Sequence, residues 1–196
     1  MTYRGMTLIE TVVTVALTLI IFLALGSMII YFYRTNAYTL QQSTAVGQAR
    51  RGVEDAMRYL RQSSYGSDGS YPIEVAATSS ITFYTNTDSD SAIERVTYLL
   101  LNGVLYRTIQ NPSGNPLSYV GASTATSTVA VSVVNGTSTP VFRYFDNTGS
   151  ELAQPVNVSR VASVRTTVII DVDVNRAPVA FTLSGGATLR NLRNQP

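Results

Sequence analysis

The most constraining feature of the sequence is an apolar run near its N-terminus. From Thr11 to Tyr33 the chain has 23 consecutive residues without a charged side chain, mostly Val, Ile, Leu, Ala and Phe. A helix of this length spans about 35 Å, which is enough to cross the hydrocarbon core of a bilayer. Arg34 ends the run, and the aromatic residues just before it suit the lipid–water interface. We therefore expect a transmembrane helix over residues 6–33.

Two other interpretations of this run fit less well. A buried helix of a soluble protein seldom continues this far without a charge. A cleaved secretory signal has a shorter apolar region, about 7–15 residues, and ends in a small-residue cleavage site. No such site follows Arg34. Glu10, at the start of the run, is costly at membrane depth unless it lies at the headgroup level or meets a cation.

The amino-acid composition excludes most of the common classes of catalytic site. The chain has no His and no Cys, and all 14 cationic side chains are Arg. Catalytic triads that use His, thiolate nucleophiles, Schiff-base lysines, P-loops and metal sites built from His or Cys are therefore excluded. The net charge of +2 is too small to argue for a nucleic-acid partner. We expect a non-enzymatic protein with no cofactor and no metal centre.

The helical pattern continues beyond the apolar run. We expect one helix from about residue 6 to residue 64, loosened near Gly47 and Gly52, with a favourable ion pair between Glu54 and Arg58. Four nearby Arg residues suit a solvated face, or a face that contacts lipid headgroups or acidic partners. The expected apolar stripe consists of Val46, Val53, Met57 and Leu60. The Arg residues are Arg50, Arg51, Arg58 and Arg61.

A turn-rich break separates this helix from a β-rich remainder. We expect a globular head over residues 66–196, with hairpin turns at Asn102-Gly103, within residues 135–140 (NGTSTP) and at Gly185-Gly186. The Asn-Gly pair is the strongest of these signals. The expected strands are Ile81–Thr85, Glu94–Leu101, Val104–Ile109, Val129–Val134, Val141–Phe145, Val164–Val174, Ala180–Leu183 and Ala187–Leu192.

Each of two acidic patterns in the head can be interpreted either as a functional site or as ordinary solvent-exposed residues. Asp88 and Asp90, within the segment TNTDSDS, are alternate oxygen donors that could start a calcium loop, but the full calcium-loop pattern is absent and a solvated loop is the simpler view. Asp171 and Asp173 would share one strand face, where paired carboxylates could serve a glycosidase. The alternation of a half-exposed strand explains them with less effort.

The segment before the apolar run carries a specific motif. Residues 4–10 read Arg4-Gly5-Met6-Thr7-Leu8-Ile9-Glu10. This segment resembles the class III signal of type IV prepilins and pseudopilins, in which a short basic leader ends in Gly and is followed by Phe or Met, Thr, Leu, Ile, Glu and a membrane helix. Most members of that family have Phe where this chain has Met6.

The resemblance implies a processing scheme. A prepilin peptidase would remove the leader, residues 1–5, by cutting after Gly5, and would methylate the new amine of Met6. Glu10 would then pair with the N-terminal amine of a neighbouring subunit, with Thr7 as a polar neighbour. Pairing would offset part of the cost of placing both charges in a bundle of low dielectric constant.

The head adds a weaker resemblance to J-type or W-type minor pseudopilins and pilins. It rests on the segments ITFYTNTDSD and ERVTYLLLNGVLYRT and on the ending Thr188-Leu189-Arg190-Asn191. The implied fold is α+β and type IV pilin-like. A long N-terminal helix, transmembrane over residues 6–33 and amphipathic over residues 34–65, would pack on an antiparallel β-rich head.

The implied function is that of a structural subunit of a type IV pilus, a type II secretion filament or a competence filament. Its partners would be the prepilin peptidase, other pilin or pseudopilin subunits and, before assembly, membrane lipid. It would cross the cytoplasmic membrane once, with its N-terminus inside and its head outside. Two alternatives stay open: a tip adhesin or DNA-binding minor pilin, and an anchored hydrolase that uses carboxylates alone.

Overall fold

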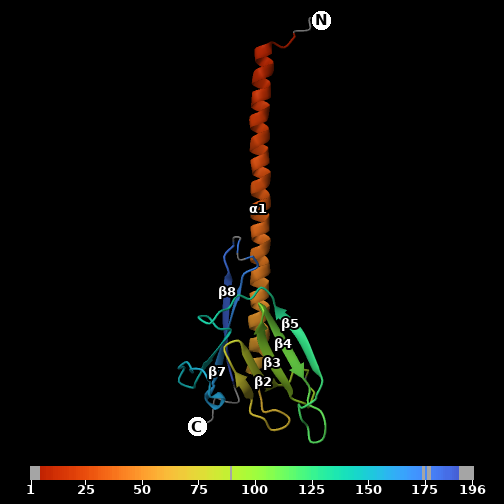
Figure 1. Cartoon of the computed structure of the whole chain (residues 1–196), viewed down its shortest axis with the longest axis vertical. Helices are drawn as coiled ribbons and strands as arrows, with labels where there is room; N and C mark the ends of the chain where they lie inside the picture. The colour runs from red at the N-terminus through yellow and green to blue at the C-terminus, as the bar shows by residue number, and fades with distance from the viewer. Residues whose placement is uncertain (1–4, 89, 174, 176–177, 190–196) are drawn as a thin grey trace. The chain divides into compact units, whose positions relative to one another are not determined.

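The computed structural model describes residues 5–88, 90–173, 175 and 178–189. The chain divides into two compact units between Gln42 and Ser43. The expected leader residue Arg4 and the ending Arg190-Asn191 lie outside the described residues. The fold class is α+β, as predicted: one long apolar N-terminal helix is followed by antiparallel β-sheets (Figure 1).

The first unit consists mainly of the first part of helix α1, which runs from Leu8 to Arg61. The helix begins two residues later than predicted because Thr7 caps it, and it ends three residues earlier than predicted. It continues unbroken through Gly47 and Gly52, so the predicted loosening there is wrong.

The second unit begins with the last part of α1, whose buried face consists mostly of small residues before Tyr59 and Leu60. The predicted stripe is only partly correct, since Val53 and Leu60 are buried but Val46 is 37% exposed. A Cβ atom on Gly52 would lie 3.3 Å from Val168 and in contact with two residues of another sheet, so the helix backbone approaches both sheets closely. The buried residues of α1 are Ala45, Ala49, Gly52, Val53, Ala56, Tyr59 and Leu60.

Five strands form an antiparallel meander in which each strand pairs with the next along the chain. Asn102 and Gly103 both have positive φ, at 50° and 73°, as a tight hairpin turn requires, and they join β3 to β4 where the sequence predicted. The strands are β1 (Ile73–Ala76), β2 (Ser80–Thr85), β3 (Glu94–Leu101), β4 (Val104–Gln110) and β5 (Thr124–Ala130).

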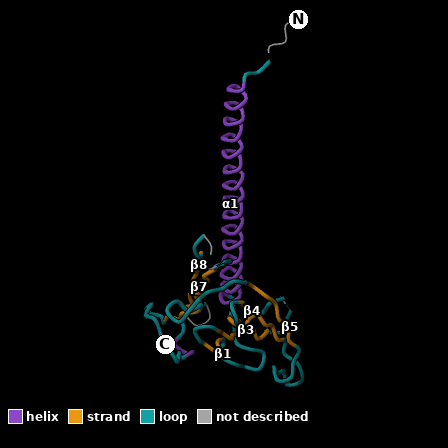
Figure 2. Tube along the Cα trace, turned by 45° about the horizontal axis from the view of Figure 1, so that its top comes forward, coloured by secondary structure: helices purple, strands orange, loops and turns teal. Residues whose placement is uncertain are grey.

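Three further strands form a second antiparallel sheet, in the order β6-β7-β8. They are β6 (Phe142–Phe145), β7 (Ser163–Ile170) and β8 (Phe181–Thr188), and a short 3-10 helix, Val158–Arg160, precedes β7. The hairpin predicted around residues 135–140 is wrong, because β5 pairs with β4 and β6 pairs with β7, in different sheets. A long loop connects β5 to β6; Figure 2 draws the strands in orange and the loops in teal.

The turn predicted at Gly185-Gly186 is also wrong, since β8 runs straight through both residues and pairs with β7. The reason is a close approach of α1. A Cβ atom on Gly185 would overlap the Met57 sulfur and lie 2.7 Å from a Val53 methyl carbon. Glycine is needed here for space beside the helix rather than for a turn.

Candidate functional site

The N-terminus of α1 is closed by its own side chains. Thr7 precedes the first helical residue, and its Oγ1 accepts a hydrogen bond from the Glu10 N–H at 3.4 Å. The Glu10 Oε2 accepts one from the Thr7 N–H at 3.5 Å. This reciprocal arrangement is a capping box. The Glu10 N–H is shared with the Thr7 carbonyl, which it reaches at 3.1 Å. Both side-chain contacts are long, so each is weak.

The residues before the cap lie outside the helix. Gly5 and Met6 are exposed and have no helical or strand assignment, and a Cβ atom on Gly5 would meet nothing within 4 Å. Glu10 is also exposed, and no described residue forms an ion pair with it. The structure therefore holds Thr7 and Glu10 in contact and leaves the Gly5–Met6 bond accessible.

After Glu10, the hydroxyl groups on the surface of α1 bond to carbonyls of their own helix. The Thr14 hydroxyl donates to the Glu10 carbonyl at 2.9 Å, and the Thr18 hydroxyl donates to the Thr14 carbonyl at 2.7 Å. Ser27 makes the same kind of bond one turn back along the helix. Because these donors are satisfied within the helix, they add little cost to burial in lipid or against another helix.

Helix α1 is long and apolar enough to cross a membrane. Its most apolar 18-residue window has no buried residue. The large hydrophobic side chains there are about half to three-quarters exposed, for example Leu23 at 74% and Phe22 at 66%. An apolar surface of this extent indicates contact with lipid or with another protein.

In the second unit, the last part of α1 is held by a charged network around Asp55. Arg107 of β4 donates from Nη1 to both Asp55 oxygens, at 2.8 and 2.9 Å. The Tyr98 hydroxyl of β3 donates to Asp55 Oδ2 at 2.7 Å. Burial, together with the Asp55 charge, raises the pKa of Tyr98 well above its ordinary value, so this hydroxyl stays protonated and can donate. The network ties the helix to the five-stranded sheet.

A hollow of about 430 Å³ lies beside this network. Arg58 reaches Asp55 at 3.5 Å and lies over the Tyr59 ring, 4.6 Å from its centre. The predicted pair of Glu54 with Arg58 does not form, because Glu54 binds Arg50 at 2.7 Å instead. Both acids at the hollow, Glu54 and Asp55, are therefore paired with arginines, whereas Arg51, which also lines it, forms no ion pair with a described residue.

The sequence predicted two pairs of neighbouring carboxylates, and the structure brings only one pair together as expected. Asp171 and Asp173 do not share a strand face, since β7 ends at Ile170. Asp171 instead accepts a hydrogen bond from the Asp173 N–H at 3.2 Å within the following loop. Asp88 and Asp90 do lie together in the β2–β3 loop, where they are joined by Glu94.

Sequence reasoning missed two features of these sites. The capping box follows from the spacing Thr7-x-x-Glu10, which is a recognised N-terminal signal, but the resemblance had assigned both residues to assembly alone. The burial of Glu94 had no signal, because an acidic residue at the start of a strand is ordinarily exposed.

No protein-family model matches this chain, and no curated protein shows significant similarity to its sequence. The class established by the fold is an α+β protein with one membrane-compatible N-terminal helix.

Proposed function

We propose that the chain is a structural, non-enzymatic subunit of a type IV filament: a minor pilin or pseudopilin of a pilus, a type II secretion system or a competence system. The observation that carries this proposal is the start of α1. An accessible glycine bond precedes a capping pair, Thr7 and Glu10, and an apolar helical segment without buried residues follows. The resemblance of residues 4–10 to the prepilin signal supplies the family.

The proposed precursor crosses the cytoplasmic membrane once, with its N-terminus inside and its head outside. A prepilin peptidase cuts between Gly5 and Met6 and methylates the Met6 amine. The exposed, non-helical chain at Gly5 supports this step, since proteases act on accessible chain outside regular structure. Before assembly the apolar helix is surrounded by membrane lipid.

Assembly follows from the cost of leaving Glu10 unpaired. A carboxylate in a bundle of low dielectric constant is expensive unless a cation faces it. The methylated amine of a neighbouring subunit supplies that cation, and the apolar helix faces pack around the pair. The hydroxyl groups of Thr14 and Thr18, which bond to their own helix, favour such packing.

The alternative of a nucleic-acid-binding head has less support. An uninterrupted row of cationic side chains would favour it. Instead, Arg50 binds Glu54, and Arg58 and Arg107 both bind Asp55. Two of the four arginines near the end of α1, Arg50 and Arg58, are therefore paired with acids, which interrupts the cationic row.

Assembly is tested with Glu10→Gln in cells that build the filament. Gln also completes a capping box, so this variant removes the charge and keeps the local cap. We expect the variant to be cleaved normally but reduced at least tenfold in the sheared filament fraction. Glu54→Gln is the matched control, because it removes an exposed acid from the same helix and should assemble normally. Equal recovery of Glu10→Gln and wild type would contradict the proposed role of Glu10.

A further inference from the structure

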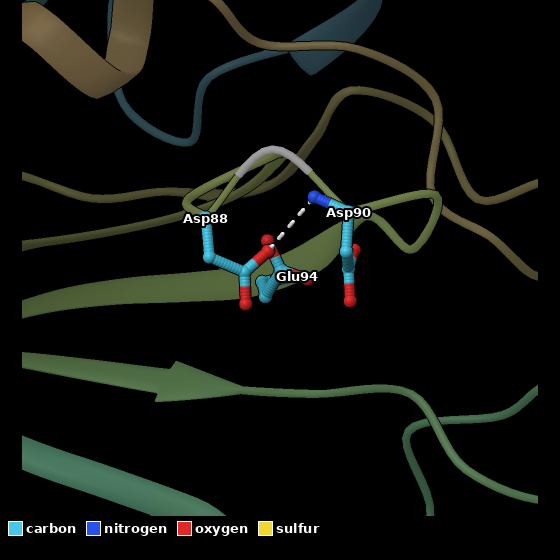
Figure 3. Close-up of side chains that lie close together, drawn as sticks. All are labelled: Asp88, Asp90 and Glu94. Atoms are coloured by element: carbon cyan, nitrogen blue, oxygen red, sulfur yellow. Dashed lines mark hydrogen bonds between the residues drawn. The ribbon is translucent and has the colours of Figure 1, made fainter.

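The loop between β2 and β3 brings three carboxylates together. Asp88 and Asp90 are exposed in this loop, whereas Glu94 is the first residue of β3 and is fully buried. One oxygen from each carboxylate lies within 4.8 Å of the other two, a grouping that occurs nowhere else in the described chain. Figure 3 shows the side chains of Asp88 and Asp90 pointing to the same side of the loop, with Glu94 between them.

Half of the Glu94 carboxylate has no partner. Its Oε2 accepts a hydrogen bond from the Thr87 N–H at 2.6 Å, but the buried Oε1 accepts none from the residues described. A buried carboxylate oxygen without a partner is costly, because it has lost its water and gained nothing in exchange.

No cation within the described part of the chain compensates this charge. None of the three carboxylates forms an ion pair there. Arg95, the next residue along β3, is held by Glu74 through bonds of 2.6 and 2.8 Å. Three carboxylates this close also repel one another, which adds to the cost of the buried one.

The loop backbone fixes the two aspartates in place. Asp88 Oδ1 accepts a hydrogen bond from the Asp90 N–H at 3.2 Å, and Asp90 Oδ1 accepts one from the Ala92 N–H at 2.7 Å. The Asn86 side chain donates to the Asp90 carbonyl at 2.6 Å. The carboxylates are therefore positioned by local bonds that leave oxygen atoms for a further ligand.

We propose that Asp88, Asp90 and Glu94 bind a calcium ion. Ca²⁺ takes six to eight oxygen ligands at about 2.3–2.6 Å, so two oxygens on one ion lie at most about 5 Å apart. The 4.8 Å spacing fits that limit. The carboxylates supply three oxygens that lie together, and water supplies the rest. Calcium suits an irregular loop better than Mg²⁺, which demands near-ideal octahedral geometry at shorter distances.

The bound ion pairs the buried Oε1 of Glu94 and ties the β2–β3 loop to the start of β3. Two of the three ligands are exposed, so we expect the weak affinity of extracellular modules, with a Kd of about 10⁻⁴–10⁻³ M. This site lies in the head and does not require cleavage or assembly of the chain.

The test uses the full chain in detergent micelles, stripped with EDTA and titrated with CaCl₂ in a calorimeter. We expect one saturable binding event, and a rise in the unfolding temperature over the same calcium range. Asp90→Asn should weaken binding at least tenfold, because it removes one exposed carboxylate ligand. Asp146→Asn is the control: it makes the same charge change at a carboxylate that accepts backbone hydrogen bonds in another turn, outside the cluster, and should bind as wild type does.

A second variant, Glu94→Gln, separates an ion site from a purely structural carboxylate. In EDTA it should unfold at or above the wild-type temperature, because it removes an uncompensated buried charge, and it should no longer respond to calcium. A large loss of stability in EDTA would overturn the proposal. So would the absence of saturable heat up to about 10 mM calcium, well above the expected Kd, or an equal response to MgCl₂ in wild type and Asp90→Asn.

Discussion

At the scale of the residue, Glu10 has a local partner that it can exchange. Its contact with the Thr7 N–H is 3.5 Å long, near the limit of a hydrogen bond. A bond between the carboxylate and a neighbouring ammonium, in which both groups are charged, is shorter, at about 2.7–2.9 Å. Thr7 still caps the Glu10 N–H after such an exchange, so the helix keeps its first turn while Glu10 changes partner.

The cap itself predicts a local effect for Thr7→Val. Losing an N-cap hydroxyl costs about 1 kcal/mol, so the first turn should fray while the rest of α1 stays helical. Amide hydrogen exchange in detergent should be faster at Glu10 and Thr11 than in wild type. Thr14→Val is the control, because its hydroxyl donates to carbonyls within the helix rather than accepting from an N–H of the first turn. Equal protection at these amides in Thr7→Val and wild type would contradict the cap.

Gly185 predicts a packing effect. Gly185→Ala forces a methyl group into Val53 and Met57, and overpacking of this kind costs about 1–3 kcal/mol. Gly186→Ala is the control, since a Cβ atom there meets nothing within 4 Å. The urea midpoint of the full chain in detergent should fall for Gly185→Ala alone. Equal midpoints for the two variants would show that α1 does not approach β8 this closely.

At the scale of the element, β1, β2 and β3 share one polar cluster. Arg95 binds Glu74 with both its Nε and Nη2 atoms, and the buried Tyr84 donates to Glu74 at 2.8 Å. The hydrogen bonds from Arg95 lower the pKa of Glu74, whereas burial, helped by the Glu74 charge, raises the pKa of Tyr84 to about 12.

This cluster predicts how stability depends on pH. The contribution of Glu74 is present above its unfolded pKa of 4.5 and is lost as the pH falls through its lower folded value. The contribution of Tyr84 is present below pH 10 and is lost as the pH rises through about 12. Glu74→Gln should therefore flatten the acid limb and Tyr84→Phe the alkaline limb, measured by urea unfolding across the pH range. Unchanged slopes in both variants would contradict these assignments.

Local signals predicted some elements well and failed at others for a definite reason. The turn at Asn102-Gly103 was predictable because two adjacent positive φ values favour these two residues almost alone. The strand through Gly185 was not predictable, because glycine is needed there to make room for a helix that lies more than 120 residues away in sequence. The buried Glu94 was not predictable either, since its surroundings are assembled by the sheet and the loop together.

At the scale of the whole molecule, the uncharged run predicted the long N-terminal helix, and the strand and turn signals after it predicted the β-rich part, which together make the α+β class. A helix that is long, apolar and exposed needs lipid or other helices around it. The orientation of the chain and its incorporation into a filament stay predictions, because they depend on molecules outside this chain.

Membrane insertion is tested by placing a charge inside or outside the run. Leu19→Arg adds about 2.5–3.5 kcal/mol to the cost of insertion near the centre of the helix. We expect less of this variant in the membrane fraction after alkaline extraction. Asn36→Arg adds the same charge beyond Arg34 and should behave as wild type does. Equal retention of both variants would contradict a transmembrane role for this segment.

The central claim is that the chain is a processed filament subunit, and the mass of its N-terminal peptide tests this most directly. With an active prepilin peptidase, the account predicts a mature chain that starts at Met6 and carries one added methyl group. Gly5→Val should block cleavage and the matched Gly26→Val should not, and a Cβ atom at either position meets nothing within 4 Å. A wild-type chain that keeps residues 1–5, beside a peptidase that cuts another prepilin in the same cells, would contradict the account.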